Sequence, residues 1–152
     1  MAVLARYLAC VSLGVLYSLM VIGGYVSAAG LGLTCPDWPL CPSGLWPTEQ
    51  YMVEWVHRVV AMFTGMLVLA TAVACWKARD RVGPATITST AAAAFVVAQI
   101  TLGALVIDQK LHAILVTVHF GIGILLFASV LLTVLFAFGL ARRREPSLRA
   151  GA

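Results

Sequence analysis

Charged residues are scarce in this chain of 152 residues. Asp, Glu, Lys and Arg together make up 11% of it, whereas hydrophobic residues make up 62% and the mean hydropathy is +1.00. A water-soluble domain of this size cannot cover its surface with so few charges. The scarcity of charge therefore excludes a soluble globular protein and indicates an integral membrane protein.

Long polar segments are scarce as well, which leaves little room for a separate soluble domain. Four apolar stretches account for most of the chain, and each is long enough to cross roughly 30 Å of hydrocarbon at about 1.5 Å per residue. We therefore predict an all-α fold, a four-helix bundle in the membrane that forms a single domain over residues 1–152. The predicted helices cover residues 7–29, 51–76, 85–107 and 112–140, and an external loop covers residues 30–50.

Basic residues are unevenly distributed between the two ends of the predicted helices. Lys and Arg near helix ends are retained on the cytoplasmic side of a membrane. If the helices alternate in direction, only Arg58 and Lys110 fall at one end, so this end is predicted to be extracytoplasmic and both termini cytoplasmic. The net charge of +4 then reflects topology and contact with anionic lipid, and does not indicate nucleic acid. The basic residues at the other end are Arg6, Lys77, Arg79, Arg81, Arg142, Arg143, Arg144 and Arg149.

Cysteines are few, and two of the four fall in the predicted external loop. Cys35 and Cys41 lie there among four prolines, which block a helix, and two tryptophans, which suit the headgroup layer. Zinc is disfavoured, because two thiolates without a nearby histidine leave its tetrahedral shell unfilled. In an oxidising compartment the pair favours a disulfide that closes a small loop. Both a structural staple and a redox-active pair stay open.

The chain has three histidines, and two of them lie inside apolar helices. His57 is six residues from the predicted start of its helix, and His119 is seven residues from the start of its own. Both helices enter from outside, so the two imidazoles are predicted at nearly the same depth on neighbouring helices. Such a pair can hold an iron from both sides, which predicts a haem. The alternative is that each histidine only stabilises packing by a hydrogen bond across helices.

Small residues beside the two histidines indicate how a haem would fit. Ala61 stands one turn after His57, and Gly123 stands one turn after His119. Each small residue shares a helix face with its histidine, where it would admit a flat macrocycle against the backbone. We therefore predict haem contacts at both positions.

Three polar residues are further candidates for the site. Glu54 shares a face with His57 and could move protons or stabilise positive charge on a substrate, the alternative being an ion pair with Arg58. Arg58 could equally hold a haem propionate, because its planar fork matches a carboxylate. His112 is predicted at the membrane interface, in a surface or lid role beside the haem and not as an iron ligand.

The chain also shows a weak internal repeat. Gly23 and Gly24 lie near the outer end of the first predicted helix, and a histidine-bearing helix follows. Gly103 and Ala104 lie likewise near the outer end of the third predicted helix, and the second histidine-bearing helix follows. The two hairpins therefore look like distant copies that face one another.

These residues resemble a known family, the haem A synthases. The specific part of the resemblance is the run Gly-Leu-Gly-Leu-Thr-Cys-Pro-Asp-Trp-Pro-Leu-Cys at residues 30–41. Glu-Trp-Val-His-Arg at residues 54–58 and Leu-Val-Thr-Val-His at residues 115–119 add to it. The resemblance covers essentially the whole chain, and it is to the amino-terminal half of the usual eight-helix enzyme.

The resemblance implies an activity, the oxidation of a ring methyl of haem O to a formyl group, which gives haem A for terminal oxidases. It implies that His57 and His119 are the haem iron ligands and that Glu54 is the catalytic residue. It also implies an external disulfide between Cys35 and Cys41. The expected haem is haem O as substrate, haem B, or both, in a multi-pass protein of the cell membrane.

The chain departs from the family in two respects. Typical members have eight helices, whereas four are predicted here, so we expect a homo-oligomer that is helped by Gly14, Gly23 and Gly24. Relatives usually carry a basic residue between positions 24 and 30, where this chain has none, so a propionate contact there is not expected. The expected partners are membrane lipid, a second copy of the chain, a haem O synthase and an electron-transfer partner.

Two other functions use parts of the same pattern. A non-enzymatic di-histidine cytochrome b subunit needs the two iron ligands but neither Glu54 nor the external cysteines. A four-helix disulfide oxidase would use outward cysteines, but such enzymes need two communicating pairs, and one pair is predicted to face outward here. The cytochrome is the closer of the two alternatives.

Overall fold

The computed structural model describes residues 1–39, 41–42 and 46–140, and these residues form an all-α bundle. Four helical segments are long and apolar enough to cross a membrane, which confirms the prediction of a multi-pass membrane protein. The elements are α1 (Ala2–Ala28), the 3-10 helix η1 (Glu49–Tyr51), α2 (Met52–Lys77), α3 (Arg79–Val82), α4 (Ala85–Asp108) and α5 (Ala113–Ala137).

The helix bounds differ most from the prediction at the end of the bundle that holds the N-terminus. Helix α1 begins five residues earlier than predicted and includes Arg6, whose Nε donates a hydrogen bond to the carbonyl oxygen of Ala137 at 2.8 Å. This bond satisfies a carbonyl at the end of α5 and lets a charged residue lie inside a helix. Helix α5 ends three residues earlier than predicted, just before Gly139, which has a positive φ of 71°.

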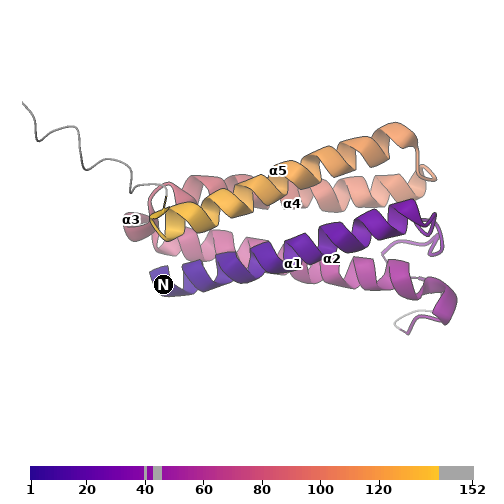
Figure 1. Ribbon diagram of the computed structural model, residues 1–152, viewed down its shortest axis with the longest axis horizontal. Helices are drawn as coiled ribbons and strands as arrows, with labels where there is room; N and C mark the ends of the chain where they lie inside the picture. The colour runs from indigo at the N-terminus through magenta and orange to yellow at the C-terminus, as the bar shows by residue number, and fades with distance from the viewer. Residues whose placement is uncertain (40, 43–45, 141–152) are drawn as a thin grey trace, which may run out of the picture.

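The four long helices pack in a ring, in the order α1, α2, α4, α5 and back to α1. Figure 1 shows that α1 starts and α5 ends at the same end of the bundle, whereas the loops after α1 and after α4 lie at the other end. Helices α2 and α5 therefore run in the same direction, as predicted. The side of the membrane on which each end lies stays a prediction, and the predicted basic cluster at residues 142–149 lies outside the described residues.

Helices α1 and α4 end in the same hydrogen-bonded turn. After α1, Gly30 N donates to Ser27 O at 3.2 Å, and the next residue donates to Val26 O at 2.9 Å. After α4, Lys110 N donates to Ile107 O at 3.0 Å, and the next residue donates to Val106 O at 2.8 Å. This pattern requires a left-handed residue, a role that Gly30 fills with φ 69° and Lys110 with φ 49°. The shared turn supports the predicted repeat of two hairpins.

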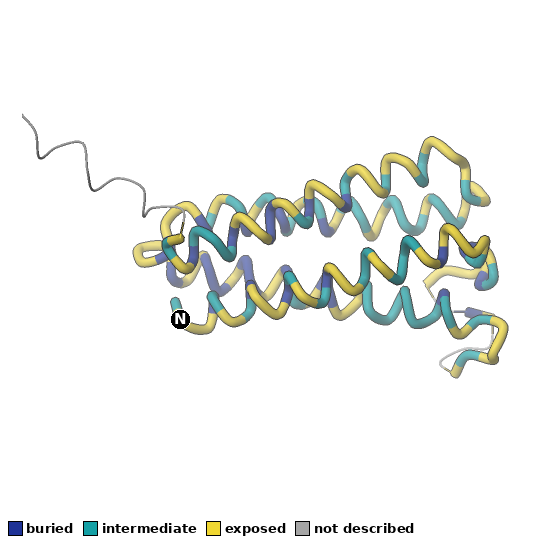
Figure 2. The backbone as a smooth tube through the Cα atoms, in the orientation of Figure 1, coloured by how far each residue is buried: buried dark blue, intermediate teal, exposed yellow. Residues whose placement is uncertain are grey.

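Buried residues gather in the half of the bundle that holds the start of α1 and the end of α5, which we call the packed half (residues 5–16, 64–75, 85–96 and 123–137). Figure 2 shows the dark blue segments concentrated there. Small side chains such as Ala5, Ala9 and Ala92 let the helices approach closely. Interhelix hydroxyl bonds join α1 to α2, between Ser12 and Thr71, and α4 to α5, from Thr133 to Thr88. The packed half therefore holds the four helices together.

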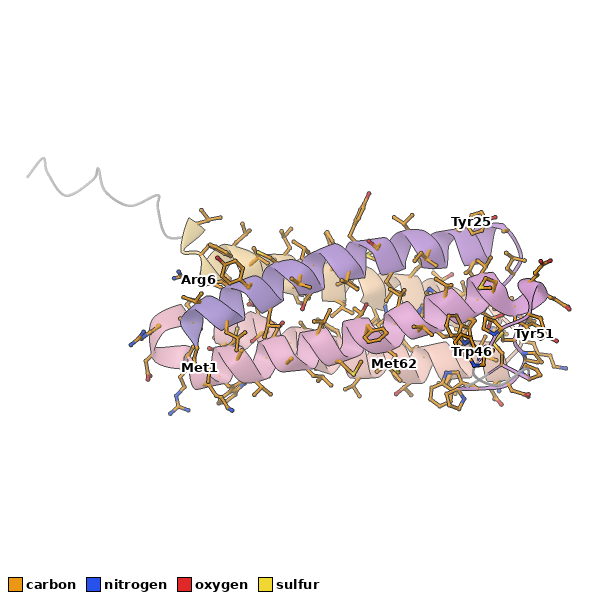
Figure 3. All side chains as sticks on the ribbon, turned by 90° about the horizontal axis from the view of Figure 1, so that it is seen from below. Met1, Arg6, Tyr25, Trp46, Tyr51 and Met62 are labelled. Atoms are coloured by element: carbon orange, nitrogen blue, oxygen red, sulfur yellow. A yellow bond between two sulfur atoms is a disulfide. The ribbon has the colours of Figure 1, made fainter. Side chains whose placement is uncertain are left out.

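Exposed aromatic side chains also lie at the loop end of the bundle. Trp46 is 85% exposed, and Figure 3 shows it with Tyr51 at the loop end, whereas Met1 and Arg6 lie at the other end. Exposed aromatic rings of this kind suit the membrane–water interface.

Leu16→Ala should destabilise the packed half, because Leu16 is 2% exposed and its loss leaves a cavity between helices. We expect the free energy of unfolding in detergent to fall by about 2–4 kcal/mol. Leu4→Ala is the matched control, since Leu4 lies on the same helix but is 49% exposed, and its effect should stay within about 0.5 kcal/mol. Equal effects of the two changes would contradict the position of the core.

Candidate functional site

His57 and His119 lie at the loop end of the bundle, one on α2 and the other on α5. His57 is five residues after Met52 and His119 is six residues after Ala113, which places them about 8 Å and about 9 Å along their helices. The helix bounds therefore support the predicted match in depth.

The prediction that the two histidines lie on neighbouring helices is wrong. Each helix packs on its partner in the hairpin, and the hairpins then join through contacts of α1 with α5 and of α2 with α4. Helices α2 and α5 therefore lie diagonally across the ring. A ligand held by both imidazoles would lie across the centre of the bundle and not in a groove between two adjacent helices.

Each imidazole lies against a glycine of the preceding long helix. A Cβ added to Gly23 of α1 would lie 2.9 Å from Cε1 of His57, and one added to Gly103 of α4 would lie 3.7 Å from Cε1 of His119. At Gly23 any side chain would therefore push the imidazole out of place. The two glycines that suggested a repeat thus have matching positions beside the two histidines.

The Nδ1 atoms of His57 and His119 are buried and have no hydrogen-bond partner among the described residues. A polar atom buried without a partner costs free energy, most of all inside a membrane, where water does not compensate. These nitrogens therefore give no support to the alternative in which the histidines act only as hydrogen-bonded packing residues.

The half of the bundle around the histidines is poorly packed. Within residues 17–25, 55–63, 97–108 and 113–122, which we call the open half, no residue is buried. Figure 2 shows intermediate and exposed segments along this half. The residues of this half are therefore less buried than those of the packed half, although the Nδ1 atoms of both imidazoles are covered.

Gln99 of α4 is a polar residue of this region that the sequence reasoning missed. Its Nε2 donates a hydrogen bond to the backbone carbonyl of His119 at 2.9 Å, and a Cβ on Gly123 would lie 2.8 Å from the same nitrogen. Gly123, predicted to face a macrocycle, therefore makes room for Gln99. An amide side chain in the middle of the apolar stretch 85–107 was the signal that could have identified it.

Glu54 is 2% exposed and its carboxylate binds the loop that follows α1. Its Oε2 accepts hydrogen bonds from Thr34 Oγ1 at 2.9 Å and from the backbone N–H of Cys35 at 2.8 Å. Its Oε1 accepts a charge-assisted bond from Arg58 Nη2 at 2.5 Å. The ion pair considered as the alternative role of Glu54 is therefore present, together with two bonds that the sequence did not reveal.

Arg58 binds the same loop through its backbone carbonyls. Nη2 donates to the carbonyl of Cys35 at 2.5 Å, and Nη1 donates to the carbonyls of Asp37 and Pro39. Both terminal nitrogens of the guanidinium are thus engaged with the loop and with Glu54. The predicted contact of Arg58 with a haem propionate would have to use its Nε–H or replace one of these bonds.

Cys35 and Cys41 are joined by a disulfide, and their Cα atoms are 4.9 Å apart. Cys35 is fully buried and Cys41 is 3% exposed. Burial restricts the access of a reductant or of a partner thiol to the sulfur atoms, which favours the structural staple over the redox-active pair.

The two loops at this end of the bundle touch each other. A Cβ on Gly32, in the first loop, would lie 3.0 Å from a methyl carbon of Leu111, in the loop between α4 and α5. His112 follows Leu111 and is exposed at the start of α5, as its predicted surface role requires. Ala61, the other predicted haem contact, is partly buried on α2.

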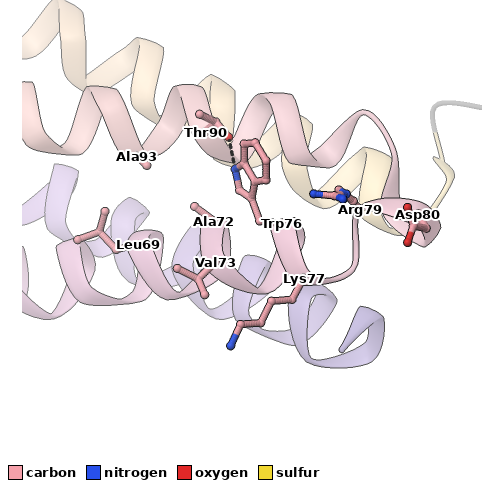
Figure 4. Close-up of a pocket in the computed structure, with 9 residues that line it drawn as sticks. All are labelled: Leu69, Ala72, Val73, Trp76, Lys77, Arg79, Asp80, Thr90 and Ala93. Carbon is pink, nitrogen blue, oxygen red and sulfur yellow. Dashed lines mark hydrogen bonds between the residues drawn. The ribbon is translucent and has the colours of Figure 1, made fainter.

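A cavity of about 740 Å³ lies at the opposite end of the bundle, between α2 and α4. Figure 4 shows Trp76 in it, with its Nε1 donating to Thr90 Oγ1 at 2.9 Å, and the charged side chains of Lys77, Arg79 and Asp80 around it. The cavity contains none of the residues predicted for the site. It is therefore separate from the histidine pair.

Within the part of the chain that the structure describes, no group of three or more His, Cys, Asp or Glu residues is placed to hold a bare metal ion. A haem iron needs fewer protein ligands, because the porphyrin supplies four nitrogens and two axial ligands complete the set. Haem binding by His57 and His119 therefore stays a prediction.

A family model described as cytochrome oxidase assembly protein matches residues 47–152. A protein named Heme A synthase from Bacillus licheniformis is 34% identical over 122 residues, which cover 78% of this chain and 40% of that protein. Another of the same name, from Bacillus pumilus, is 35% identical over 147 residues, which cover 94% of this chain and 48% of that protein.

A third similar protein, from Halobacterium salinarum, is named Protoheme IX farnesyltransferase. It is 35% identical over 132 residues, which cover 84% of this chain and 28% of that protein. The chain thus spans about half or less of the length of these curated relatives.

Arg58→Met should release the loop from α2. We expect a soluble phosphine to reduce the disulfide of Cys35 and Cys41 at least about tenfold faster, because a hydrogen bond to a charged group contributes about 1.5–3 kcal/mol. Trapping the released thiols with a maleimide at successive times measures the rate. Arg6→Met is the control, since it removes the same charge at the other end of the bundle. Wild-type rates in Arg58→Met would refute the role of Arg58.

Proposed function

This chain belongs to the haem A synthase family of cytochrome oxidase assembly proteins, and on that premise we propose that it oxidises a ring methyl of haem O to the formyl group of haem A. The observation that carries the proposal is the pair of buried, unpartnered imidazole nitrogens at one depth on α2 and α5. They lie in the open half, where no residue of the four helices is buried and a flat apolar ring would add buried contacts. A haem between them would give both imidazoles a partner.

In this proposal His57 and His119 hold the iron of the haem, one from each side of the ring. Bound haem supplies a redox-active iron and a conjugated ring from which electrons can be withdrawn. Gly23 holds the orientation of His57 by leaving room for its imidazole and for nothing larger. Ala61 and His112 are the proposed haem contacts on α2 and at the start of α5. At Gly123 the contact would be made through Gln99, which covers that glycine.

The reaction needs an oxygen atom and an acceptor for electrons. Conversion of a methyl group and one water to a formyl group releases four protons and four electrons. We propose that water supplies the oxygen atom, because an iron that both histidines would hold has no position left for dioxygen. The electrons then leave to a one-electron carrier of the membrane, which is the proposed electron-transfer partner.

Glu54 is the proposed acceptor for the released protons. It stands three residues before His57 on the same face of α2, and its carboxylate is buried beside the loop. Because the same oxygens accept bonds from Thr34, Cys35 and Arg58, a proton on the carboxylate would also weaken the attachment of the loop. Arg58 would meet a haem propionate through its Nε–H, or by exchanging a loop carbonyl for it.

The proposed partners follow from the same chemistry. A haem O synthase would supply the substrate, and the similarity to a protein named Protoheme IX farnesyltransferase supports this link. A second copy of the chain is also proposed. Of the three glycines expected to help self-association, Gly23 is covered by His57, whereas Gly14 and Gly24 face open space.

Expression of the full chain beside a haem O synthase tests the proposed function. Chromatography of the extracted pigments should show haem A together with hydroxylated haem O. Haem B as the sole pigment would support the cytochrome b alternative and refute the synthase. Expression without the haem O synthase is the control, and it should yield no haem A.

Replacing both iron ligands should abolish haem binding. We expect the purified His57→Ala/His119→Ala variant to lose the low-spin Soret band that the wild type shows with haem, because the iron then has no axial ligand from the chain. His112→Ala is the matched control and should keep the low-spin band, since His112 is exposed at the helix start. A low-spin spectrum in the double variant would show that other residues hold the iron.

Glu54→Gln should leave haem bound but reduce its conversion by about 100-fold or more, because an amide does not accept the proton. The yield of haem A in cells that supply haem O measures conversion, and the Soret band measures binding. The rate of disulfide reduction shows whether the variant also loosens the loop. A normal yield of haem A would remove Glu54 from the chemistry, whatever happens to the loop.

A further inference from the structure

Three buried side-chain atoms in the described residues have no hydrogen-bond partner, and the third of them is Oε1 of Gln99. The other two are the Nδ1 atoms of His57 and His119. The three atoms come from α4, α2 and α5, and all of these residues lie in the open half. Because the amide of Gln99 is bonded to the backbone of His119, its unpartnered acceptor indicates a further contact to the ligand proposed for that histidine.

The orientation of the Gln99 amide follows from its one hydrogen bond. The partner of Gln99 is the backbone carbonyl of His119, and a carbonyl only accepts, so the bonding group must be the amide nitrogen. The amide oxygen is therefore directed away from that carbonyl. Gly123 supports this arrangement, because a Cβ at that position would lie 2.8 Å from the amide nitrogen.

Packing alone does not require an amide at this position. Gln99 stands four residues before Gly103, which contacts His119, and Leu19 stands four residues before Gly23, which contacts His57. Leu19 packs against the apolar core of the packed half. The first hairpin therefore uses an apolar side chain where the second uses an amide with a free oxygen. A hydrogen-bond donor on the ligand explains this difference, because a buried amide oxygen without a donor is unfavourable.

We infer that Oε1 of Gln99 accepts a hydrogen bond from the hydroxyl group of the hydroxyethylfarnesyl chain of haem O and so selects haem O over haem B. This inference rests on the proposed function. Haem B carries vinyl groups and has no hydroxyl, so it would leave the amide oxygen unpartnered. A site with a buried polar group discriminates strongly against an analogue that lacks the matching group.

Titration of the purified protein with haem O and with haem B, followed by the Soret band, tests the inference. Gln99→Leu should weaken haem O binding about tenfold and leave haem B binding unchanged, because one buried hydrogen bond is lost. Gln99→Met, which keeps the shape of the side chain, should give the same result if Gln99→Leu does not fold. Gln109→Leu is the matched control, since Gln109 is exposed at the end of the same helix, and it should bind both haems like the wild type.

Two outcomes would overturn this inference and leave the proposed function standing. Unchanged haem O affinity in the Gln99 variants would show that the oxygen contacts no hydroxyl. Equal weakening for both haems would show that Gln99 only supports the backbone at His119. If the wild type bound neither haem, the proposed function itself would fail and the selectivity would fail with it.

Discussion

A buried polar atom in a membrane needs a partner, and the candidate site depends on this constraint. In a soluble protein a water molecule can supply the hydrogen-bond partner of a buried imidazole. In hydrocarbon the partner must come from the chain or from a ligand. The described residues supply none for Nδ1 of His57 or of His119. The chain could have used leucine at both positions without this cost. The proposed ligand between α2 and α5 would supply this partner, which gives a physical reason for a histidine at both positions.

The two halves of the bundle differ in how their helices are held together. In the packed half, small residues and hydroxyl bonds such as the one between Ser12 and Thr71 hold the helices close. This attachment stabilises the bundle although no residue of the open half is buried. A haem in the open half would add contact area where the side chains leave it out, so binding would also stabilise the fold.

Much of the fold could be predicted from the sequence, because the length and hydropathy of the apolar runs determine how many helices cross the membrane. The depth of the two histidines followed from the same reasoning, since it needs only the helix starts. Their diagonal arrangement did not, because it depends on how two hairpins pack, and local sequence carries no information on that. Gln99 was missed since its role depends on a contact with the backbone of another helix. The predicted role of Arg58 was incomplete for the same reason, because the sequence does not show which backbone carbonyls a side chain will bind.

Glu54 and Arg58 connect the loop to the helix that carries His57. The carboxylate accepts bonds from Thr34 and from the N–H of Cys35, and the guanidinium donates to the carbonyl of the same cysteine. Both backbone groups of Cys35, at the start of the disulfide loop, are therefore bound to α2. These residues lie within one turn of His57, whereas Gly32 of the same loop contacts Leu111, just before α5. The loop thus reaches from one histidine helix to the start of the other. A change in the charge of Glu54 would therefore act on the attachment of the loop as well as on the proposed transfer of a proton, so one carboxylate would couple the two.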